Sequence, residues 1–269
     1  MKKIIFISIA AIVLLSSCQK HERIHPSGYL VTHTFTLSNL FPWSTPQENS
    51  FITGIDIFDM AADLQIYISE DEEEDDKITI IVDDNVYPHI NRSAFGSGQF
   101  NDSGELIAYN YTINLQYGHV SFMGRKPNLT IILNVKTLER IGLSGASTSR
   151  IEDTLFCKNL EIHLRGASTL RAGQIEANNI VAVLSGASRM DLSGQCETLD
   201  LTLSGASSAF GYGMVCDNLK AVFSGASRGE FTVLKTLSAT LSGASTLYYR
   251  GNPTITYLNT SGSSRLEKR

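Results

Sequence analysis

The chain has 269 residues and a formal net charge of −5 at neutral pH, an acidic balance that argues against nucleic acid as a partner. Its 21 glycines, its many β-branched residues and its few helix-favouring runs indicate an all-β protein. The length suffices for one long domain or two ordinary ones.

The first 17 residues have the features of a secretory signal peptide. They begin with the positive segment Met1-Lys2-Lys3, followed over residues 4–15 by an apolar run. This run is too short to span a bilayer, which needs about 20 residues. Small residues then precede Cys18, as in the bacterial lipobox, in which the cysteine is diacylated and becomes the new N-terminus. We therefore expect a signal peptide over 1–17 and lipidation at Cys18, with an ordinary secretory signal as the alternative.

The rest of the chain divides into a tether and one β domain. Residues 18–48 are expected to form a lipid-anchored linker, because residues 19–28 are polar and include Pro26. Residues 49–269 are expected to form a single domain, with a cap over 49–137 and repeats over 138–269. The cap contains alternating segments that predict partly antiparallel strands, at 51–57, 63–68, 77–82 and 111–115. Such a cap would cover the open sheet edge at the end of a repeat stack.

The second half repeats the phrase Leu-Ser-Gly-Ala-Ser six times with small variations. Its glycines are Gly145, Gly166, Gly186, Gly205, Gly225 and Gly243, and a divergent seventh copy contains Gly262. Successive glycines are separated by 21, 20, 19, 20, 18 and 19 residues. A near-constant step of this size is typical of a stacked solenoid.

Within each repeat, apolar and polar residues alternate with period two before the turn. Positions two and four before each of the six glycines are apolar, and so is the position six before five of them, while the position five before is mostly polar. Each repeat therefore carries a half-buried strand, and the glycine supplies a positive φ at the turn. We predict a right-handed parallel β-helix of about 19–20 residues per coil. An antiparallel meander would place identical turns at alternate ends of the sheet, and the repeated phrase does not favour that arrangement.

Three cysteines fall in one column of this stack. Cys157, Cys196 and Cys216 are separated by 39 and 20 residues, which are two repeats and one repeat. Ala177 and Leu234 are expected at the equivalent position, so we interpret the column as small buried apolar residues. A Cys196–Cys216 disulfide is the alternative.

Other chemically active side chains do not converge in the sequence. We interpret the acidic run over 70–76 as a solvated loop, with calcium binding as the alternative, and we expect no metal and no cofactor. The acidic residues of the repeats lie in several columns, whereas glycoside hydrolysis needs two carboxylates that face one bond. A row of arginines follows the turns, and we interpret it as a solvated charged face, with binding of anionic glycans or a partner as the alternative. These arginines are Arg150, Arg171, Arg189, Arg228, Arg250 and Arg265.

The strand over 51–57, the segment from Pro127 to Ile131 and the serial Ser-Gly-Ala-Ser turns together resemble a known family. It is called putative auto-transporter adhesin, head GIN domain, and the resemblance covers roughly residues 50–262. The resemblance implies a secreted or lipid-anchored β-helical protein of a kind common in Bacteroidetes. It implies adhesion and supplies no catalytic residues.

Our hypothesis is a non-enzymatic lipoprotein that acts as an adhesin or binding scaffold. Lipidated Cys18 would anchor it in the outer membrane, on the cell surface or the periplasmic face, and its partner would be a glycan or a cell-surface protein. The competing hypothesis is a carbohydrate-active β-helix enzyme, either a polysaccharide lyase or a hydrolase. A cleft lined by two or more converging carboxylates would favour the enzyme.

Overall fold

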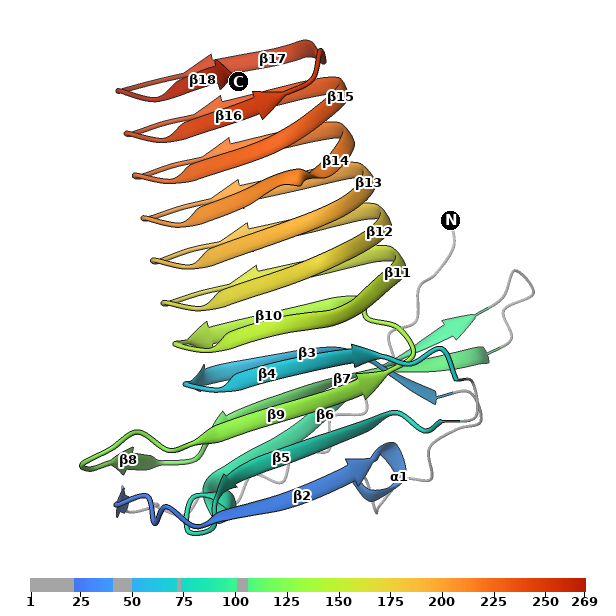
Figure 1. The fold of residues 1–269 in the computed structure, drawn as a ribbon, viewed down its shortest axis with the longest axis vertical. Helices are drawn as coiled ribbons and strands as arrows, with labels where there is room; N and C mark the ends of the chain where they lie inside the picture. Colours follow the sequence, from blue (N-terminus) through green and yellow to red (C-terminus); the bar gives the residue numbers. More distant parts are fainter. Residues whose placement is uncertain (1–21, 41–49, 72–73, 101–105) are drawn as a thin grey trace.

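A computed structural model of the chain describes residues 22–40, 50–71, 74–100 and 106–269. The predicted signal peptide and Cys18 lie outside these described residues. A parallel β-solenoid of about six turns stands on a partly antiparallel sheet (Figure 1). The predicted fold class is confirmed. Among the described residues, no helix is long and apolar enough to cross a membrane.

The solenoid strands pair in parallel with their copies in the next coil, and long strands bend around the coil. They are β10 (Arg140–Gly145), β11 (Thr148–Leu164), β12 (Thr169–Leu184), β13 (Arg189–Leu203), β14 (Ser208–Phe223), β15 (Arg228–Leu241), β16 (Thr246–Arg250), β17 (Thr254–Thr260) and β18 (Arg265–Lys268). The preceding elements are β1 (Glu22–Ile24), β2 (Leu30–Thr36), α1 (Leu37–Leu40), β3 (Ser50–Met60), β4 (Asp63–Ile68), β5 (Lys77–Asp83), η1 (Tyr87–His89), β6 (Ile90–Phe100), β7 (Leu106–Tyr117), β8 (Val120–Phe122) and β9 (Leu129–Val135).

The apolar columns become ladders of buried side chains inside the stack. The ladder two residues before each glycine is in register from coil to coil and consists of Leu143, Leu164, Leu184, Leu203, Phe223 and Leu241. All six are at most 2% exposed. Burying a side chain of this size contributes about 1.5–3 kcal/mol, so a coil is stabilised mainly by the coils above and below it.

The turn glycines have a backbone conformation and a packing environment that exclude a side chain. Gly166, Gly186, Gly205, Gly225 and Gly243 have φ between 71° and 76°. A Cβ atom at these five positions would lie 2.5–2.7 Å from the carbonyl oxygen of the glycine in the preceding coil. Gly145 has φ 82°, and its Cβ would meet the carbonyl oxygen of Met60 at 2.5 Å. Glycine is therefore required both by the positive φ and by the stacking distance.

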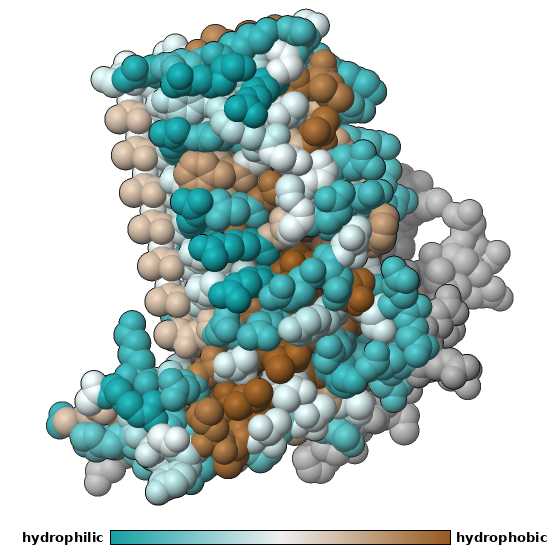
Figure 2. Space-filling model, viewed as in Figure 1, coloured by the Kyte–Doolittle hydropathy of each residue, from teal (hydrophilic) through white to brown (hydrophobic). Residues whose placement is uncertain are grey.

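The two residues after each glycine have different roles. The alanines are exposed, and Figure 2 shows a straight row of weakly apolar residues along this edge of the solenoid. The serines are buried in the turn. Ser188 and Ser207, for example, donate their hydroxyls to the carbonyl oxygens of Ser185 and Ser204, at 2.9 Å in both cases. The final serine forms this bond within its own turn in four of the six copies, at Ser168, Ser188, Ser207 and Ser245.

The solenoid begins earlier than the predicted boundary at 138. β3 pairs in parallel with β10, and β4 pairs in parallel with β11, so β3 and β4 form a coil of their own. Met60 takes the place of the turn glycine, because it accepts a hydrogen bond from Ala146 as Gly145 does from Ala167. Just before it, Asp59 adopts the positive φ, at 50°. This coil lacks the repeated phrase, which is why the sequence pattern assigned it to the cap.

The prediction of a linker over 18–48 was wrong for residues 22–40. β2 pairs antiparallel with β5 along its whole length, and β1 pairs in parallel with β8. Half-buried Val31, His33 and Phe35 alternate with exposed neighbours along β2, as expected for an edge strand with one covered face. The rest of the cap is partly antiparallel as predicted, because β5 pairs antiparallel with β9 and β6 with β7.

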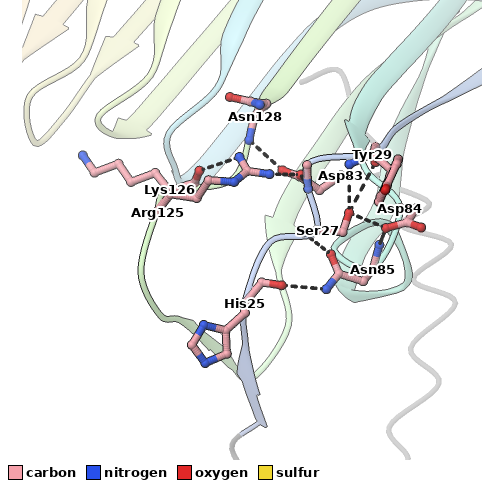
Figure 3. A network of polar contacts seen from close by, with 10 residues as sticks. His25, Ser27, Tyr29, Asp83, Asp84, Asn85, Arg125, Lys126 and Asn128 are labelled. Atoms are coloured by element: carbon pink, nitrogen blue, oxygen red, sulfur yellow. Dashed lines mark hydrogen bonds and ion pairs between the residues drawn. The ribbon is translucent and has the colours of Figure 1, made fainter.

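A buried carboxylate fastens the N-terminal segment to the cap (Figure 3). Asp83, at the end of β5, is fully buried. It accepts hydrogen bonds from the backbone of Gly28 at 2.7 Å and of Asn128 at 2.9 Å, and it pairs with the guanidinium of Arg125. Burial raises the pKa of Asp83, but these donors outweigh it and the pKa is lowered from its ordinary value. The carboxylate thus joins three segments that are far apart in the sequence.

This lowered pKa predicts a specific acid sensitivity. A carboxyl group whose pKa is depressed in the folded state contributes stability above its unfolded pKa and loses it as the pH falls through the folded value. We expect the stability from Asp83 to fall from about pH 4 downwards. Chemical denaturation of the wild type and Asp83→Asn at a series of pH values measures the effect. The difference in free energy of unfolding should shrink as the solution is acidified, and a constant difference down to pH 2 would contradict the assignment.

Candidate binding surfaces

The coils present three outward flanks, because each long strand bends partway round the coil and shifts register there. The leading flank consists of outward residues just before the turns, such as Glu161 and His163. The arginine flank consists of those just after the turns, such as Arg150 and Arg189. The cysteine flank lies beyond the bend and includes Phe156 and Cys157.

The structure brings the predicted row of arginines to one flank. Arg150 and Arg171 are in register, and Asp191 continues the column in the next coil. Together with neighbouring backbone these three line a shallow open hollow of about 290 Å³. The view of Figures 1 and 2 looks onto this flank, which Figure 2 shows as a largely hydrophilic surface. The arginine flank is therefore a largely polar surface along the stack.

A second hollow lies on the leading flank, where the cap meets the solenoid. It has a volume of about 490 Å³ and is lined by two carboxylates, Glu139 and Glu161, with Arg140 between them in the lining. The guanidinium of Arg140 donates to Asp56 at 3.0 Å and to Glu161 at 2.6 Å. The second Glu161 oxygen lies 2.6 Å from the Nε2 atom of His163. Sequence reasoning missed this group, because its members come from three coils and meet only through the register of β3, β10 and β11.

The electrostatics of this hollow favour an ion-pair network over acid catalysis. Burial raises the pKa of Glu161, but the hydrogen bonds from His163 and Arg140 prevail, and the pKa is lowered. The general acid of a glycoside hydrolase needs the opposite, a raised pKa that keeps it protonated. Glu161 is thus held as an ionised acceptor. The hollow thus contains two carboxylates, but Glu161 lacks the protonation that the chemistry requires.

The column of cysteines forms as predicted except at one position, where another residue takes the place of Leu234. Cys157, Ala177, Cys196 and Cys216 are in register, but the next residue is Val233. Leu234, predicted for this position, is 50% exposed on the cysteine flank, because the register shifts between β14 and β15 on both sides of the column. The three cysteines are free thiols, and the Sγ atoms of Cys196 and Cys216 lie 3.1 Å apart.

Burial should make these thiols slow to react. Burial, followed by the nearby charge of Glu139, raises the pKa of Cys157 to about 11, and the thiolate is the reactive form. We expect iodoacetamide at neutral pH to alkylate half-buried Cys157 slowly, and buried Cys196 and Cys216 only after unfolding. Peptide mass spectrometry of the native and denatured chain measures this, and rapid native alkylation of Cys216 would contradict the burial.

The acidic run has a structural member at its end. Asp76 is buried and accepts backbone hydrogen bonds from Ile52 at 2.6 Å and Lys136 at 3.1 Å. Burial raises its pKa in spite of these bonds. Within the described part of the chain, no group of three or more His, Cys, Asp or Glu residues could hold a metal ion. Residues 72 and 73 lie outside that part, so the interpretation of the whole run stays a prediction.

Residues 59–253 match the family described as "Putative auto-transporter adhesin, head GIN domain". The chain belongs to this family. The match runs from the end of β3 to just after β16 and includes every turn from Gly145 to Gly243. The predicted recognition is confirmed. No protein of curated function matches the sequence.

Solved structures from Bacteroidetes share the fold at low sequence identity. A putative adhesin from Bacteroides fragilis has a TM-score of 0.71 and 17% identity, over 91% of this chain and 98% of that one. A putative adhesin from Parabacteroides distasonis has a TM-score of 0.62 and 14% identity, over 92% of this chain and 100% of that one. A putative lipid binding protein from the same species has a TM-score of 0.61 and 13% identity, with the same coverage. At these identities the likeness shows the fold alone.

Proposed function

We propose that the chain is a non-enzymatic binding protein of the cell envelope, an adhesin-type scaffold that presents its flanks to a partner. The observation that carries the proposal is the arginine flank, a polar surface repeated from coil to coil. Repetition of outward side chains on a rigid stack suits the binding of an extended partner. Membership in a family described as adhesins supports a binding role.

The hollow with two carboxylates is the specific observation that speaks for an enzyme. Its carboxylate Glu161 has a lowered pKa because it forms hydrogen bonds with His163 and Arg140, so it is poorly suited to donate a proton. In the proposed function this network fixes the cap to the first coils.

We infer the location of the protein from its sequence, and this inference completes the proposal. A signal peptide over 1–17 and lipidation at Cys18 would tether the β domain to the outer membrane, since two acyl chains give stable attachment. The side of the membrane decides which partner the flanks can reach.

Two measurements on cells that express the full chain test this proposal. Metabolic labelling with a radioactive or clickable fatty acid should mark the wild type and not Cys18→Ala. External protease should remove the domain from intact cells, and those cells should lose adhesion to glycan-coated or cell-coated surfaces. Adhesion unchanged by deletion of the chain would contradict the binding role.

A further inference from the structure

The arginine flank has an order that repeats every second coil. Five successive coils place Arg-X-acid and hydroxyl-X-aromatic segments in alternation, in unbroken register. The segments are Arg189-Met190-Asp191, Ser208-Ala209-Phe210, Arg228-Gly229-Glu230, Thr246-Leu247-Tyr248 and Arg265-Leu266-Glu267. We call the three arginines Arg189, Arg228 and Arg265 the arginine ladder.

Each arginine of the ladder pairs with the acid of its own coil. Arg189 donates to both oxygens of Asp191 at 2.9 and 2.8 Å, and Arg228 donates to Glu230 at 2.7 Å. The Arg228 side chain is 51% exposed, whereas that of Glu230 is 12% exposed. Likewise, the side chain of Arg189 is 49% exposed and that of Asp191 is 29% exposed. The acids are therefore more buried than the arginines, whose side chains are about half exposed to solvent.

Two of the guanidinium groups stack on aromatic rings of the intervening coils. Arg189 lies over the ring of Phe210 at 4.3 Å, and Arg228 lies over the ring of Tyr248 at 4.7 Å. A guanidinium has five N–H donors in a fixed planar arrangement. The acid uses some of them and the ring uses none, so the remaining donors are pre-oriented towards solvent. Little side-chain entropy would be lost when such a group binds an anion.

The charge of the flank is opposite to that of the chain. The segments that follow the turns, 148–152 and its six equivalents up to 265–269, contain eight basic and four acidic residues, whereas the whole chain has a formal charge of −5. Arg150 and Arg250 have no ion-pair partner among the described residues. The flank is thus a local basic surface on an acidic protein, and it complements an anion.

The spacing of the ladder selects among anions. Coils stack about 4.8 Å apart, so the arginines of the ladder recur at about 9.6 Å along the axis. This is close to the length of two sugar residues in an extended polysaccharide. Ser208 and Thr246 stand between the arginines in the same column, where their hydroxyls can meet an uncharged sugar.

We propose that the arginine ladder binds an anionic polysaccharide that lies along the solenoid axis and carries its carboxylate or sulfate groups on alternate sugars. The proposal rests on the binding function proposed above and assigns it a ligand class and a site. The anionic groups of the ligand would bind the outward guanidinium donors. One disaccharide would span two coils, so each anionic group would meet one arginine of the ladder.

Titration of the full-length chain in detergent with hyaluronan, which carries a carboxylate on every second sugar, tests the proposal. The ladder variant Arg189→Gln/Arg228→Gln/Arg265→Gln should bind about tenfold more weakly, because three exposed charge pairs are lost. The control variant Lys158→Gln/Lys220→Gln/Lys235→Gln loses the same charge from the other two flanks and should bind like the wild type. A tetrasaccharide should bind more tightly than a disaccharide. Circular dichroism and thermal unfolding verify that both variants fold.

Several outcomes would overturn the inference. They are equal weakening in both variants, absence of hyaluronan binding, and binding of double-stranded DNA as tight as that of hyaluronan at the same salt concentration. Neutral dextran should not bind in any case. Cells that adhere through the ladder variant as well as through the wild type would leave the proposed function standing and remove this site from it. If the chain binds hyaluronan but its deletion does not affect adhesion, the arginine ladder would stand as a binding site and the proposed adhesion function would fail.

Discussion

Replacing Gly205 with valine is expected to lower the free energy of unfolding by about 2–5 kcal/mol. Gly205 has φ 72°, which costs a residue with a Cβ atom about 1–2 kcal/mol. Its Cβ would also lie 2.7 Å from the carbonyl oxygen of Gly186, and forcing atoms into a packed site costs about 1–3 kcal/mol more. Chemical denaturation followed by circular dichroism measures the loss.

Gly173 offers a matched control in the same solenoid. A Cβ atom at Gly173 would have no heavy atom within 4 Å, and its φ is not positive. Gly173→Val should therefore change the free energy of unfolding by less than about 0.5 kcal/mol. Equal stability of the two variants would show that the turn does not need glycine, and the stacked-turn assignment would be wrong.

Replacing Asp83 with alanine is expected to destabilise the cap by about 2–4 kcal/mol. The change removes the buried carboxylate that accepts hydrogen bonds from the backbone N–H groups of Gly28 and Asn128, and a hydrogen bond to a charged group contributes about 1.5–3 kcal/mol. The guanidinium of Arg125 loses its partner as well. Hydrogen exchange should speed up in β2 and β5 and stay slow in β12 and β13, because the solenoid core does not contact this site.

The neighbouring Asp84 serves as the control. It is exposed and accepts a hydrogen bond from the hydroxyl of Ser27 at 2.6 Å. Asp84→Ala should cost less than about 1 kcal/mol, as expected for an exposed polar contact. A loss as large as that of Asp83→Ala would mean that the turn, and not the buried carboxylate, holds the N-terminal segment.

The repeated turns and the apolar columns could be predicted from the sequence because each repeat contains its own evidence. The leucine ladder needs only a constant step and period-two alternation, and both are visible in the printed sequence. The coil of β3 and β4 could not be found in this way. Asp59 adopts the positive φ there, and an aspartate at a left-handed position leaves no pattern that distinguishes it from an ordinary loop residue.

The binding surfaces were only partly visible in the sequence. The arginines could be collected as a row, but their alternation with Phe210 and Tyr248 spans two repeats and depends on the register between coils. The group of Asp56, Arg140 and Glu161 depends on register as well, since Asp56 precedes its partners by most of the cap. Spacing predicts most of the residues that share a column, although a register shift puts Val233 and not Leu234 beside Cys216. It does not predict which side chains of neighbouring columns meet.

The most direct measurement compares retention with turnover. Labelled hyaluronan, polygalacturonate and dextran are incubated with the full-length chain, and both the bound fraction and the chain length of each polysaccharide are recorded. We expect the chain to retain anionic polysaccharide while its length distribution stays unchanged. New chain ends that appear with the wild type and disappear with Glu161→Gln would show catalysis in the hollow beside Arg140, and would contradict a protein that only binds.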